Sequence, residues 1–289
     1  MAIQEFQIGK IKFDLHYQSG NKRKLPLVLF IHGFKSFRRW GFIPFLCEEI
    51  SKENFLVLNF DFSMNGVISE YPVHFDNAIF SKNTVKQELE DTSNLLEYLL
   101  GQRENNINDN ELNMILGDRW DGTIFLLGHS RGGAIAMLTS LLFSEVKKIA
   151  LLATIAYFDR YTERLKKEWA EKGLLEFQDT MSKQVLQIDY SYIKDIEQNK
   201  EKYNLLESAN KINIPVLFVH GNNDLSVKYN EAKEIFTILE KNQKSSCNFV
   251  IIKNANHLFN VSHPFIQTNK YLDEALKIIL KFLKENEAS

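Results

Sequence analysis

Short apolar runs alternate with longer amphipathic stretches along most of this chain. The amphipathic stretches carry apolar residues at helical spacing, as Leu89, Leu96 and Leu100 do. Each short run is nearly continuous in apolar residues, which is typical of strands buried on both faces of a parallel sheet. The predicted strands are residues 26–31, 55–60, 123–127, 149–153, 215–219 and 248–252, and the predicted helices are residues 40–52, 81–100, 131–143, 230–241 and 268–285. This alternation predicts an α/β fold with a doubly wound, mostly parallel central sheet flanked by helices.

Three segments depart from the alternation. Residues 3–17 are expected to form an antiparallel hairpin at one edge of the sheet, and the polar, Asn-rich residues 102–122 a surface excursion. Residues 155–212 are rich in Lys and Glu, have helical periodicity and fall between two predicted strands. We expect them to form a small helical cap, because ligands of open α/β sheets bind beyond the carboxyl ends of the strands. The predicted division is a core in two parts, residues 1–154 and 213–289, with a helical cap insertion at 155–212.

Composition and charge narrow the classes of function. The 289 residues are 44% hydrophobic and 25% charged, as in globular proteins, and their net charge of -2 lacks the basic character of nucleic-acid binders. No apolar run approaches the ~20 residues of a membrane-spanning helix. The first residues lack the basic and apolar regions of a secretory signal, so we expect a cytoplasmic protein. Cys47 and Cys247 lie in apolar contexts and are expected to be buried thiols.

The segment from Gly128 to Gly132 has the pattern G-x-S-x-G, with Ser130 at its centre. It follows a predicted strand and opens a predicted helix, which is the context of a nucleophile elbow. So sharp a turn pushes the serine toward a positive φ, at a cost of roughly 1–3 kcal/mol, and side chains at Gly128 and Gly132 would collide there. We therefore expect Ser130 to be a nucleophile. The alternative is a tight turn with a chance serine.

A serine nucleophile needs a general base, which in turn needs an orienting acid. In this architecture the chain order is Ser, then Asp or Glu, then His. Asp224 follows the predicted strand 215–219, and His257 follows 248–252, so both are expected at the sheet edge where Ser130 lies. His263 is the rival base, and an Asx turn is the alternative role for Asp224. The other histidines occupy the hairpin, an excursion or strand ends: His16, His32, His74, His129 and His220.

Two backbone N–H groups are needed to hold the oxyanion of an acyl transfer. We expect one from Arg131, directly after the nucleophile, and one from Phe34, in the loop after the strand 26–31. Several apolar side chains are expected to line an acyl or alcohol pocket, although core or cap packing is the alternative for each of them. These are Phe34, Trp40, Met64, Tyr157, Trp169, Leu225 and Phe259.

Motifs for other chemistries are missing from the sequence. It contains no H-E-x-x-H and no Cys/His cluster, so no metal site is predicted. Neither G-x-G-x-x-G nor G-x-x-x-x-G-K-[ST] follows a predicted strand, so no nucleotide cofactor is predicted. The expected reactants are therefore a small-molecule acyl ester and water, with no cofactor.

Four motifs in this order make the sequence resemble the α/β-hydrolase fold family over nearly its whole length: His32-Gly33-Phe34, GHSRGG, HGNND and NANH. The resemblance implies Ser130 as nucleophile, Asp224 as acid, His257 as base, and Phe34 and Arg131 as oxyanion donors. The stretches HGFKSFRRWGF and NFDFSMNG are similar to bacterial serine hydrolases with a short helical cap, a subgroup that resembles both carboxylesterases and serine aminopeptidase-like enzymes. Many relatives have Asp-x-Arg-Gly-x-Gly where this chain has the residues from Asp61 to Gly66. Serine at the elbow argues against the dehalogenase, epoxide-hydrolase and dienelactone-hydrolase branches.

The expected function is a serine hydrolase that cleaves carboxylic esters through an acyl-enzyme. One alternative is an aminopeptidase-like amide or peptide hydrolase, in which Glu163, Glu168 or Glu171 clamps the substrate amine. The other alternative is a hydrolase-like binding protein that has lost catalysis. The complete set of Ser130, Asp224 and His257 favours an enzyme.

Overall fold

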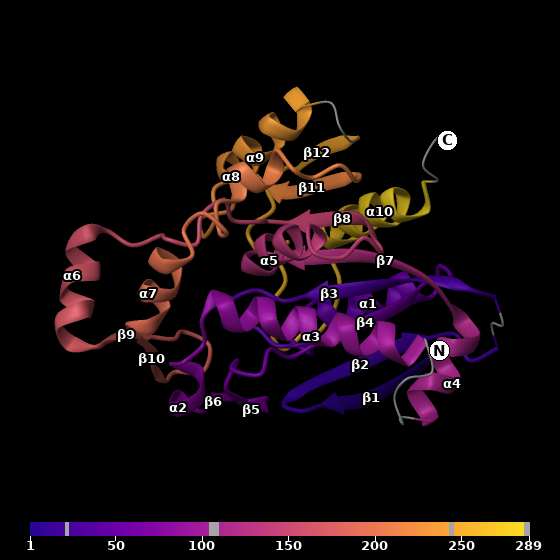
Figure 1. Cartoon of the computed structure of the whole chain (residues 1–289), viewed down its shortest axis with the longest axis horizontal. Coiled ribbons are helices and arrows are strands. Elements are labelled where there is room, and N and C mark those ends of the chain that lie inside the picture. The colour runs from indigo at the N-terminus through magenta and orange to yellow at the C-terminus, as the bar shows by residue number, and fades with distance from the viewer. Residues whose placement is uncertain (21–22, 104–109, 243–245, 286–289) are drawn as a thin grey trace.

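A computed structural model describes residues 1–20, 23–103, 110–242 and 246–285. Its centre is an eight-stranded sheet with the order β1-β2-β4-β3-β7-β8-β11-β12 (Figure 1). The strands are β1 (Ala2–Ile8), β2 (Ile11–Tyr17), β3 (Leu25–Ile31), β4 (Leu56–Phe60), β7 (Trp120–His129), β8 (Val146–Leu152), β11 (Val216–Gly221) and β12 (Cys247–Ile252). The strands from β4 to β12 are parallel, whereas β1 and β2 form an antiparallel hairpin at one edge. The predicted doubly wound α/β fold with its N-terminal hairpin is confirmed.

The five predicted helices are present, with shifted ends. They are α1 (Ile43–Ser51), α3 (Val85–Arg103), α5 (Arg131–Ser140), α9 (Tyr229–Asn242) and α10 (Lys270–Lys284). In Figure 1, α3 and α5 cover one face of the sheet, and α1 and α10 cover the other. The inner strands are therefore buried on both faces: every residue of β4 and β11 is buried. This burial accounts for their continuous apolar runs.

The strand register brings the chemistry-bearing loops together. Ile31 pairs with Gly128, so the loop after β3 starts beside the end of β7. Gly221 pairs with Ile252, so the loops after β11 and β12 also start side by side. Because carboxyl ends of parallel strands share one edge, all four loops lie at the same end of the sheet.

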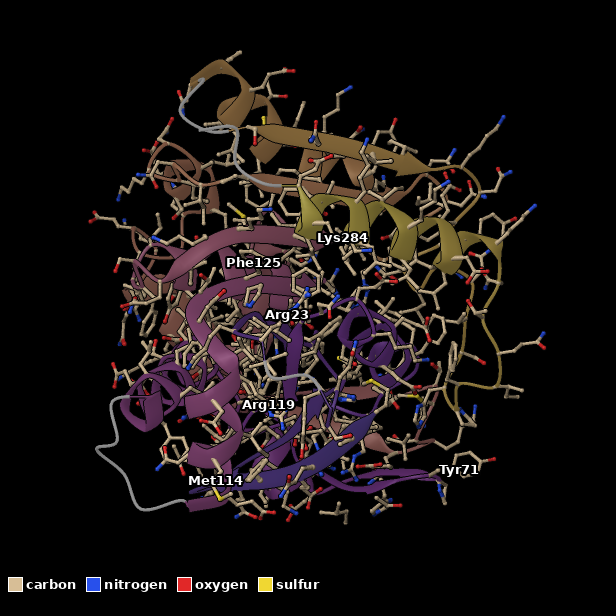
Figure 2. The ribbon with its side chains drawn as sticks, turned by 90° about the vertical axis from the view of Figure 1, so that its right-hand side faces the viewer. Arg23, Tyr71, Met114, Arg119, Phe125 and Lys284 are labelled. Atoms are coloured by element: carbon tan, nitrogen blue, oxygen red, sulfur yellow. The ribbon has the colours of Figure 1, made fainter. Side chains whose placement is uncertain are left out.

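The excursion predicted at residues 102–122 contains a helix, α4 (Asn110–Arg119), which is a correction. Leu112 and Leu116 are fully buried, and α4 packs on α3 and β7. Its apolar face is too short to stand out among the polar residues around it. Figure 2 shows Met114 of α4 at the outer edge of the molecule, and its side chain is exposed. Part of the predicted excursion, residues 104–109, lies outside the described residues.

Residues 155–212, called the insertion below, are not purely helical, which is a second correction. They contain α6 (Glu163–Lys172), β9 (Leu174–Gln178), β10 (Val185–Asp189), α7 (Ser191–Gln198) and α8 (Leu205–Ala209). Thr162 caps the start of α6, and Gly173, at φ 77°, ends it in the left-handed conformation. The antiparallel β9–β10 hairpin follows, in which Leu186 and Ile188 are buried. The indole N–H of Trp169 in α6 donates to the Ile188 carbonyl at 2.9 Å.

The insertion projects beyond one end of the sheet, at the left of Figure 1. Three short elements not predicted from the sequence lie near it: β5 (Val67–Glu70), β6 (Val73–Phe75) and α2 (Asn77–Phe80), which contacts β10. The last helix of the insertion, α8, packs on α5 and α9 of the core. Among the described residues, no helix combines the length and the hydrophobicity that a membrane span requires.

Candidate active site

Ser130 occupies the turn between β7 and α5 with φ 56° and ψ -121°, in the positive-φ region that the sequence predicts. Its backbone N–H donates to the Leu152 carbonyl at 2.8 Å, and its carbonyl accepts from the N–H of Gly133 at 3.0 Å. A non-glycine residue held there stores about 1–3 kcal/mol of strain, which is typical of functional sites. Neighbouring backbone therefore fixes the position of the serine.

Glycines around Ser130 allow the close approach of three elements. A Cβ at Gly128 would lie 2.4 Å from the Gly132 carbonyl oxygen, and one at Gly132 would lie 2.1 Å from the Ile31 oxygen of β3. One at Gly133 would lie 2.5 Å from Oγ1 of Thr154. The helix α5 thus sits directly on backbone, which leaves no room for larger residues at these positions.

Asp224 and His257 lie on two loops that are joined to each other. A Cβ at Gly221 would lie 2.2 Å from the carbonyl oxygen of Ala255, and the Asn223 N–H donates to that same oxygen at 2.9 Å. This contact brings Nδ1 of His257 to 2.7 Å from Oδ2 of Asp224. The acid and base predicted from chain order are therefore hydrogen-bonded.

The carboxylate of Asp224 is fully buried and saturated with donors. Its Oδ1 accepts from the N–H groups of Ser226 and Val227 at 2.9 and 2.8 Å. Its Oδ2 lies 3.2 Å from Nε2 of His220, whose N–H also donates to the Val227 carbonyl at 2.9 Å. Burial alone would raise the pKa of Asp224, but the hydrogen bonds with His220 and His257 outweigh burial and hold that pKa well below its usual range. Asp224 is therefore ionised at neutral pH.

His220 is a partner of the acid that sequence reasoning missed. It ends β11 four residues before Asp224, and its side chain is almost fully buried. The usable signal was its place at the start of the HGNND motif. Because the Val227 carbonyl can only accept, Nε2 of His220 carries a proton. His220 is therefore a second side chain, besides His257, that donates to Oδ2 of Asp224.

His257 presents the nitrogen required of a base. Its Nδ1–H donates to Asp224, so Nε2 carries the lone pair. Its carbonyl accepts from Nε2–H of His129 at 2.9 Å, and the two rings are 4.8 Å apart. Burial, together with the proximity of His257, lowers the pKa of His129 to about 3, so His129 is a neutral support. In the described structure Ser130 Oγ and His257 form no hydrogen bond. In unliganded enzymes, such bonds often form only when substrate binds.

The rival base, His263, has both ring nitrogens engaged. Nδ1 accepts from the Gly41 N–H at 3.0 Å, and Nε2 donates to the Glu70 carbonyl at 2.7 Å. Its ring also stacks on Trp40, with ring centroids 6.0 Å apart. A histidine held in one tautomer by two backbone groups has a structural role.

The loop after β3 passes directly over Ser130. A Cβ at Gly33 would lie 3.0 Å from the Cβ of Ser130. The two predicted oxyanion donors are the N–H groups of Phe34, in this loop, and Arg131, the first residue of α5. Within the described part of the chain, neither N–H donates to another protein group. For Arg131 this follows from its place in the first turn of a helix.

Arg38, which sequence reasoning did not single out, anchors this loop. Its backbone N–H and its guanidinium donate to the two carboxylate oxygens of Asp61, at 2.8 and 2.6 Å. It also reaches Asp14 at 3.2 Å. Asp61 opens the turn that departs from the pattern of many relatives, and Asn65 closes that turn by donating to Asp61 at 3.1 Å. Asp61, which the pattern of many relatives also has, is thus an anchor for the loop that carries Phe34.

Two of the predicted pocket residues link the core to the insertion. Phe34 is half-buried, with its ring centroid 5.5 Å from that of Phe80 and 6.2 Å from that of Phe177 of β9. The Trp40 indole N–H donates to the sulfur of Met181 at 3.3 Å, and the ring is nearly buried. Lys35, between them, pairs with Asp179 at 2.9 Å.

The other predicted pocket residues are scattered. Trp169 and Phe259 have 1% and 0% of their surface exposed, in the interiors of the insertion and the core. Leu225 is 94% exposed, and Tyr157 is exposed with its hydroxyl bonded to Glu234. Met64 is partly exposed. Their place in a substrate pocket stays a prediction, and the packing of Trp169 and Phe259 does not favour it.

The acidic residues considered as an amine clamp face solvent on α6. Glu163 is 90% exposed and pairs with Lys166. Glu168 pairs with Arg164 at 3.0 Å, and Glu171 is exposed. Their role as an amine clamp stays a prediction, and the ion pairs of Glu163 and Glu168 with neighbouring cations do not favour it.

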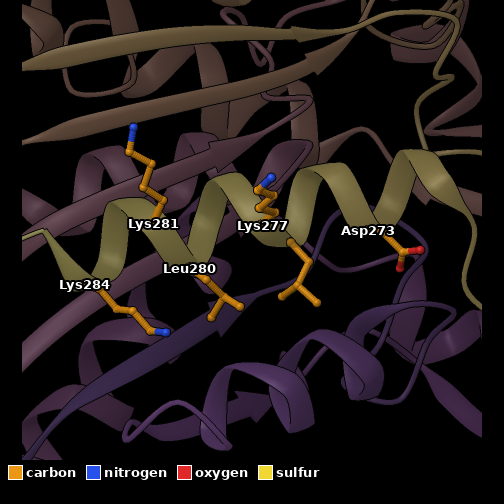
Figure 3. Close-up of a pocket in the computed structure, with 6 residues that line it drawn as sticks. Asp273, Lys277, Leu280, Lys281 and Lys284 are labelled. Atoms are coloured by element: carbon orange, nitrogen blue, oxygen red, sulfur yellow. The ribbon is translucent and has the colours of Figure 1, made fainter.

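Two cavities lie away from the candidate site. A groove of about 360 Å³ runs along α10 and is lined by Asp273, Leu276, Lys277, Leu280, Lys281 and Lys284. Figure 3 shows Lys277 and Lys281 on one side of this helix and Leu280 and Lys284 on the other. The second cavity, of about 510 Å³, is lined in part by Pro26 and Thr123, at the start of β3 and β7. Across the described ranges, no three His, Cys, Asp or Glu side chains are grouped to hold a metal ion.

Comparison with known proteins gives a family and a fold. The sequence model of the prolyl oligopeptidase family matches residues 122–288, which is more than half of the chain. No curated protein sequence matches the chain. Est1E from Butyrivibrio proteoclasticus with ferulic acid bound is 19% identical, with 99% of this chain and 100% of that chain covered and a TM-score of 0.66. The mouse alpha/beta hydrolase domain-containing protein 10 is 19% identical, with 98% of each chain covered and a TM-score of 0.64. An esterase from Pyrococcus furiosus is 18% identical, with 98% of this chain and 90% of that chain covered and a TM-score of 0.58. In each case the similarity covers 98% or more of this chain.

Proposed function

The chain belongs to the prolyl oligopeptidase family and has the α/β-hydrolase fold, and we propose that it is a serine hydrolase that cleaves carboxylic esters through an acyl-enzyme. The observation that carries the proposal is the 2.7 Å hydrogen bond between His257 and the ionised Asp224, at the sheet edge where Ser130 is held with positive φ. These are the three groups that acyl transfer requires, in the chain order of this fold.

In the proposed mechanism, Oγ of Ser130 attacks the acyl carbonyl while Nε2 of His257 takes its proton. Asp224 holds His257 in the tautomer with a proton on Nδ1 and stabilises the imidazolium that forms. His257 then returns the proton to the leaving alcohol. Water then attacks the acyl carbon while His257 takes its proton. The second tetrahedral intermediate expels Oγ of Ser130, which takes that proton back from His257, and the carboxylic acid is released.

The N–H groups of Phe34 and Arg131 would hold the oxyanion of each tetrahedral intermediate. Both lie next to Ser130 in the fold, and both lack a protein acceptor in the described structure. Donors that are fixed before the reaction stabilise charge as it develops, and losing one typically costs about 2.7–4 kcal/mol of transition-state stabilisation.

The insertion is proposed to act as a cap over this site. Its β9–β10 hairpin contacts the loop after β3 through Phe177 and through the Lys35–Asp179 ion pair. Hydrogen bonds with Lys35 and Ser182 hold the pKa of Asp179 below its usual range in spite of burial, which keeps the ion pair charged. A cap attached at this loop would shape the acyl pocket without supplying Ser130, Asp224 or His257.

Ester cleavage is favoured over peptide cleavage by two observations. The Pyrococcus furiosus protein, which shares the fold over nearly the whole chain, is an esterase by name. In addition, Glu163 and Glu168, two of the three residues considered as an amine clamp, are already paired with cations of α6. Amide or peptide hydrolysis is the second candidate, since the matching family is named for an oligopeptidase. The proposed reactants are a small acyl ester and water, and the proposed location is the cytoplasm.

The test is a panel of aryl esters with graded acyl chains, run beside aminoacyl arylamides. The proposal predicts that esters are cleaved with the higher kcat/KM and that Ser130→Ala abolishes this activity. Faster cleavage of the arylamides would favour the peptidase alternative. No turnover of either class, and no reaction with a fluorophosphonate, would favour the non-catalytic alternative.

A further inference from the structure

The side chain of Arg131 forms a buried ion pair that the proposed reaction does not use. Its guanidinium, 9% exposed, donates to Oε1 of Glu88 on α3, whose side chain is 1% exposed. Asn83 donates to the same oxygen at 2.7 Å. The pair is incompletely satisfied, because Nε of Arg131 and Oε2 of Glu88 are buried without a partner in the described residues.

Such a pair is poorly explained by stability alone. Replacing a buried ion pair with apolar residues of similar volume is often neutral or stabilising. Buried polar atoms without partners add a further penalty. The Arg131–Glu88 pair is therefore expected to have a functional role in addition to holding α3 to α5.

The geometry of Arg131 suggests what this is. Its backbone N–H is one proposed oxyanion donor. Its guanidinium carbon lies 4.4 Å from the ring centroid of Phe34, whose backbone N–H is the other donor. One side chain thus connects the two residues that would hold the oxyanion. The guanidinium also lies 5.8 Å from the ring of Tyr192 in α7, so the insertion packs on the same group.

We propose that Glu88 and the Arg131 side chain are positioning residues that hold Phe34, and with it the second oxyanion donor, in place over Ser130. This inference rests on the proposed function. Glu88 fixes the guanidinium, the guanidinium covers the face of the Phe34 ring, and the ring fixes the loop after β3. The loop depends on such a hold because Lys35, the next residue, has φ 59°. A displacement of about 1 Å at a reacting centre can cost about 100-fold in rate.

The decisive variant replaces both charges together, as Glu88→Met and Arg131→Met. Removing both avoids an unpaired buried charge, so the fold is expected to survive, and both backbone N–H groups remain. The matched control is Lys86→Met with Glu90→Met, an exposed ion pair of 3.8 Å on the same helix. Thermal unfolding and circular dichroism check that each variant is folded.

With a short-chain ester, the double variant is expected to lose about 10- to 100-fold in kcat with KM within threefold of wild type, because oxyanion contacts act only in the transition state. The inhibition constant of an aryl boronate, which places an oxygen where the oxyanion forms, should rise by a similar factor. Arg131→Lys keeps a cation and should retain more of kcat than Arg131→Met alone. The control pair should match wild type in every assay.

A folded double variant with wild-type kcat and boronate affinity would overturn the inference. If that variant does not fold, Phe34→Leu decides, since it keeps the backbone N–H and the apolar packing but removes the ring face. Loss of kcat at constant KM supports positioning through Phe34, and unchanged kcat contradicts it. An active Ser130→Ala enzyme would instead refute the proposed function itself, which separates the two failures.

Discussion

Nδ1 of His257 lies 2.7 Å from Oδ2 of Asp224, and the two residues come from loops that follow neighbouring parallel strands. The backbone contact between Gly221 and Ala255 sets this distance, because no side chain fits between the loops. His220 and two backbone N–H groups hold the carboxylate from its other sides. The position of the imidazole is therefore determined by the sheet rather than by a flexible segment.

His257→Ala is expected to abolish ester hydrolysis, whereas His263→Ala should retain most of kcat. The reason is that both nitrogens of His263 are bonded to backbone groups, while His257 has Nε2 available. Loss of the proposed base should cost roughly 10⁴–10⁶ in turnover. His263→Ala should lower the melting temperature, since it removes two partly buried hydrogen bonds. Kinetics and thermal unfolding of both variants test this, and a larger loss of kcat in His263→Ala would move the base there.

Asp224 should make the free energy of unfolding decrease as the pH falls below about 4. Its pKa is depressed in the folded state, whereas that of an unfolded aspartate is about 3.9. Below about pH 4 the unfolded chain therefore binds a proton that the folded chain does not, so this contribution to stability is complete above pH 4 and is lost as pH falls toward the folded pKa.

Asp224→Asn should accordingly flatten the fall in the free energy of unfolding between about pH 4 and pH 2, relative to wild type. Denaturant titrations at several pH values measure this slope. Comparing variants is necessary because buried acids such as Asp61 and Asp91, whose pKa values are raised by burial, contribute with the opposite sign. Identical slopes for the two proteins would contradict the depressed pKa.

Gly132→Ala is expected to destabilise the protein severely. The added Cβ would lie 2.1 Å from the Ile31 carbonyl oxygen, which is backbone of a central strand and cannot yield. Overpacking of a core typically costs about 1–3 kcal/mol, and a clash with backbone places this variant at the upper end of that range. The matched control is Gly117→Ala in α4, where nothing lies within 4 Å and stability should rise by roughly 0.5–1 kcal/mol. Equal melting temperatures for the two variants would show that α5 does not sit on β3 as described.

Asp179→Asn should change the preference of the enzyme for acyl-chain length. This substitution breaks the ion pair between the β9–β10 hairpin and Lys35, so the proposed cap loses an attachment to the loop after β3. A methylene in an apolar pocket is worth about 1–3 kcal/mol, or roughly 10- to 200-fold in discrimination. The measurement is kcat/KM for aryl esters of increasing chain length, with the exposed Glu176→Gln on the same hairpin as control. A chain-length profile identical to wild type would remove the support for a cap.

The central strands and the order of the three candidate residues were predictable, because continuous apolar runs and the G-x-S-x-G turn are local patterns. The helix α4 was not, since it shows only Leu112, Ile115 and Leu116 as an apolar face, within a polar segment. The β9–β10 hairpin was missed because its strands are only partly buried. They therefore lack the continuous apolar run that marks the central strands.

The residues that support the site could not be predicted for a related reason. Arg38 and Glu88 act through contacts with residues 23 and 43 positions away in the sequence. His220 lies four residues before its partner Asp224, and its place at the start of the HGNND motif was the one usable signal. No local spacing distinguishes a buried glutamate on α3 from the exposed Glu90 two residues later. Likewise, Trp169 appears in the sequence as a pocket aromatic, but its indole is bonded inside the insertion.

The most direct test of the proposed function is covalent labelling with a small fluorophosphonate, followed by mass spectrometry of the digested protein. One adduct is expected, on Ser130, formed in proportion to the loss of esterase activity. Ser130→Ala should carry no adduct and be inactive but folded, and His257→Ala should react far more slowly than wild type. An adduct on another serine, or an Ser130→Ala variant that keeps even a tenth of wild-type activity on a short-chain ester, would contradict the assignment of Ser130 as the nucleophile.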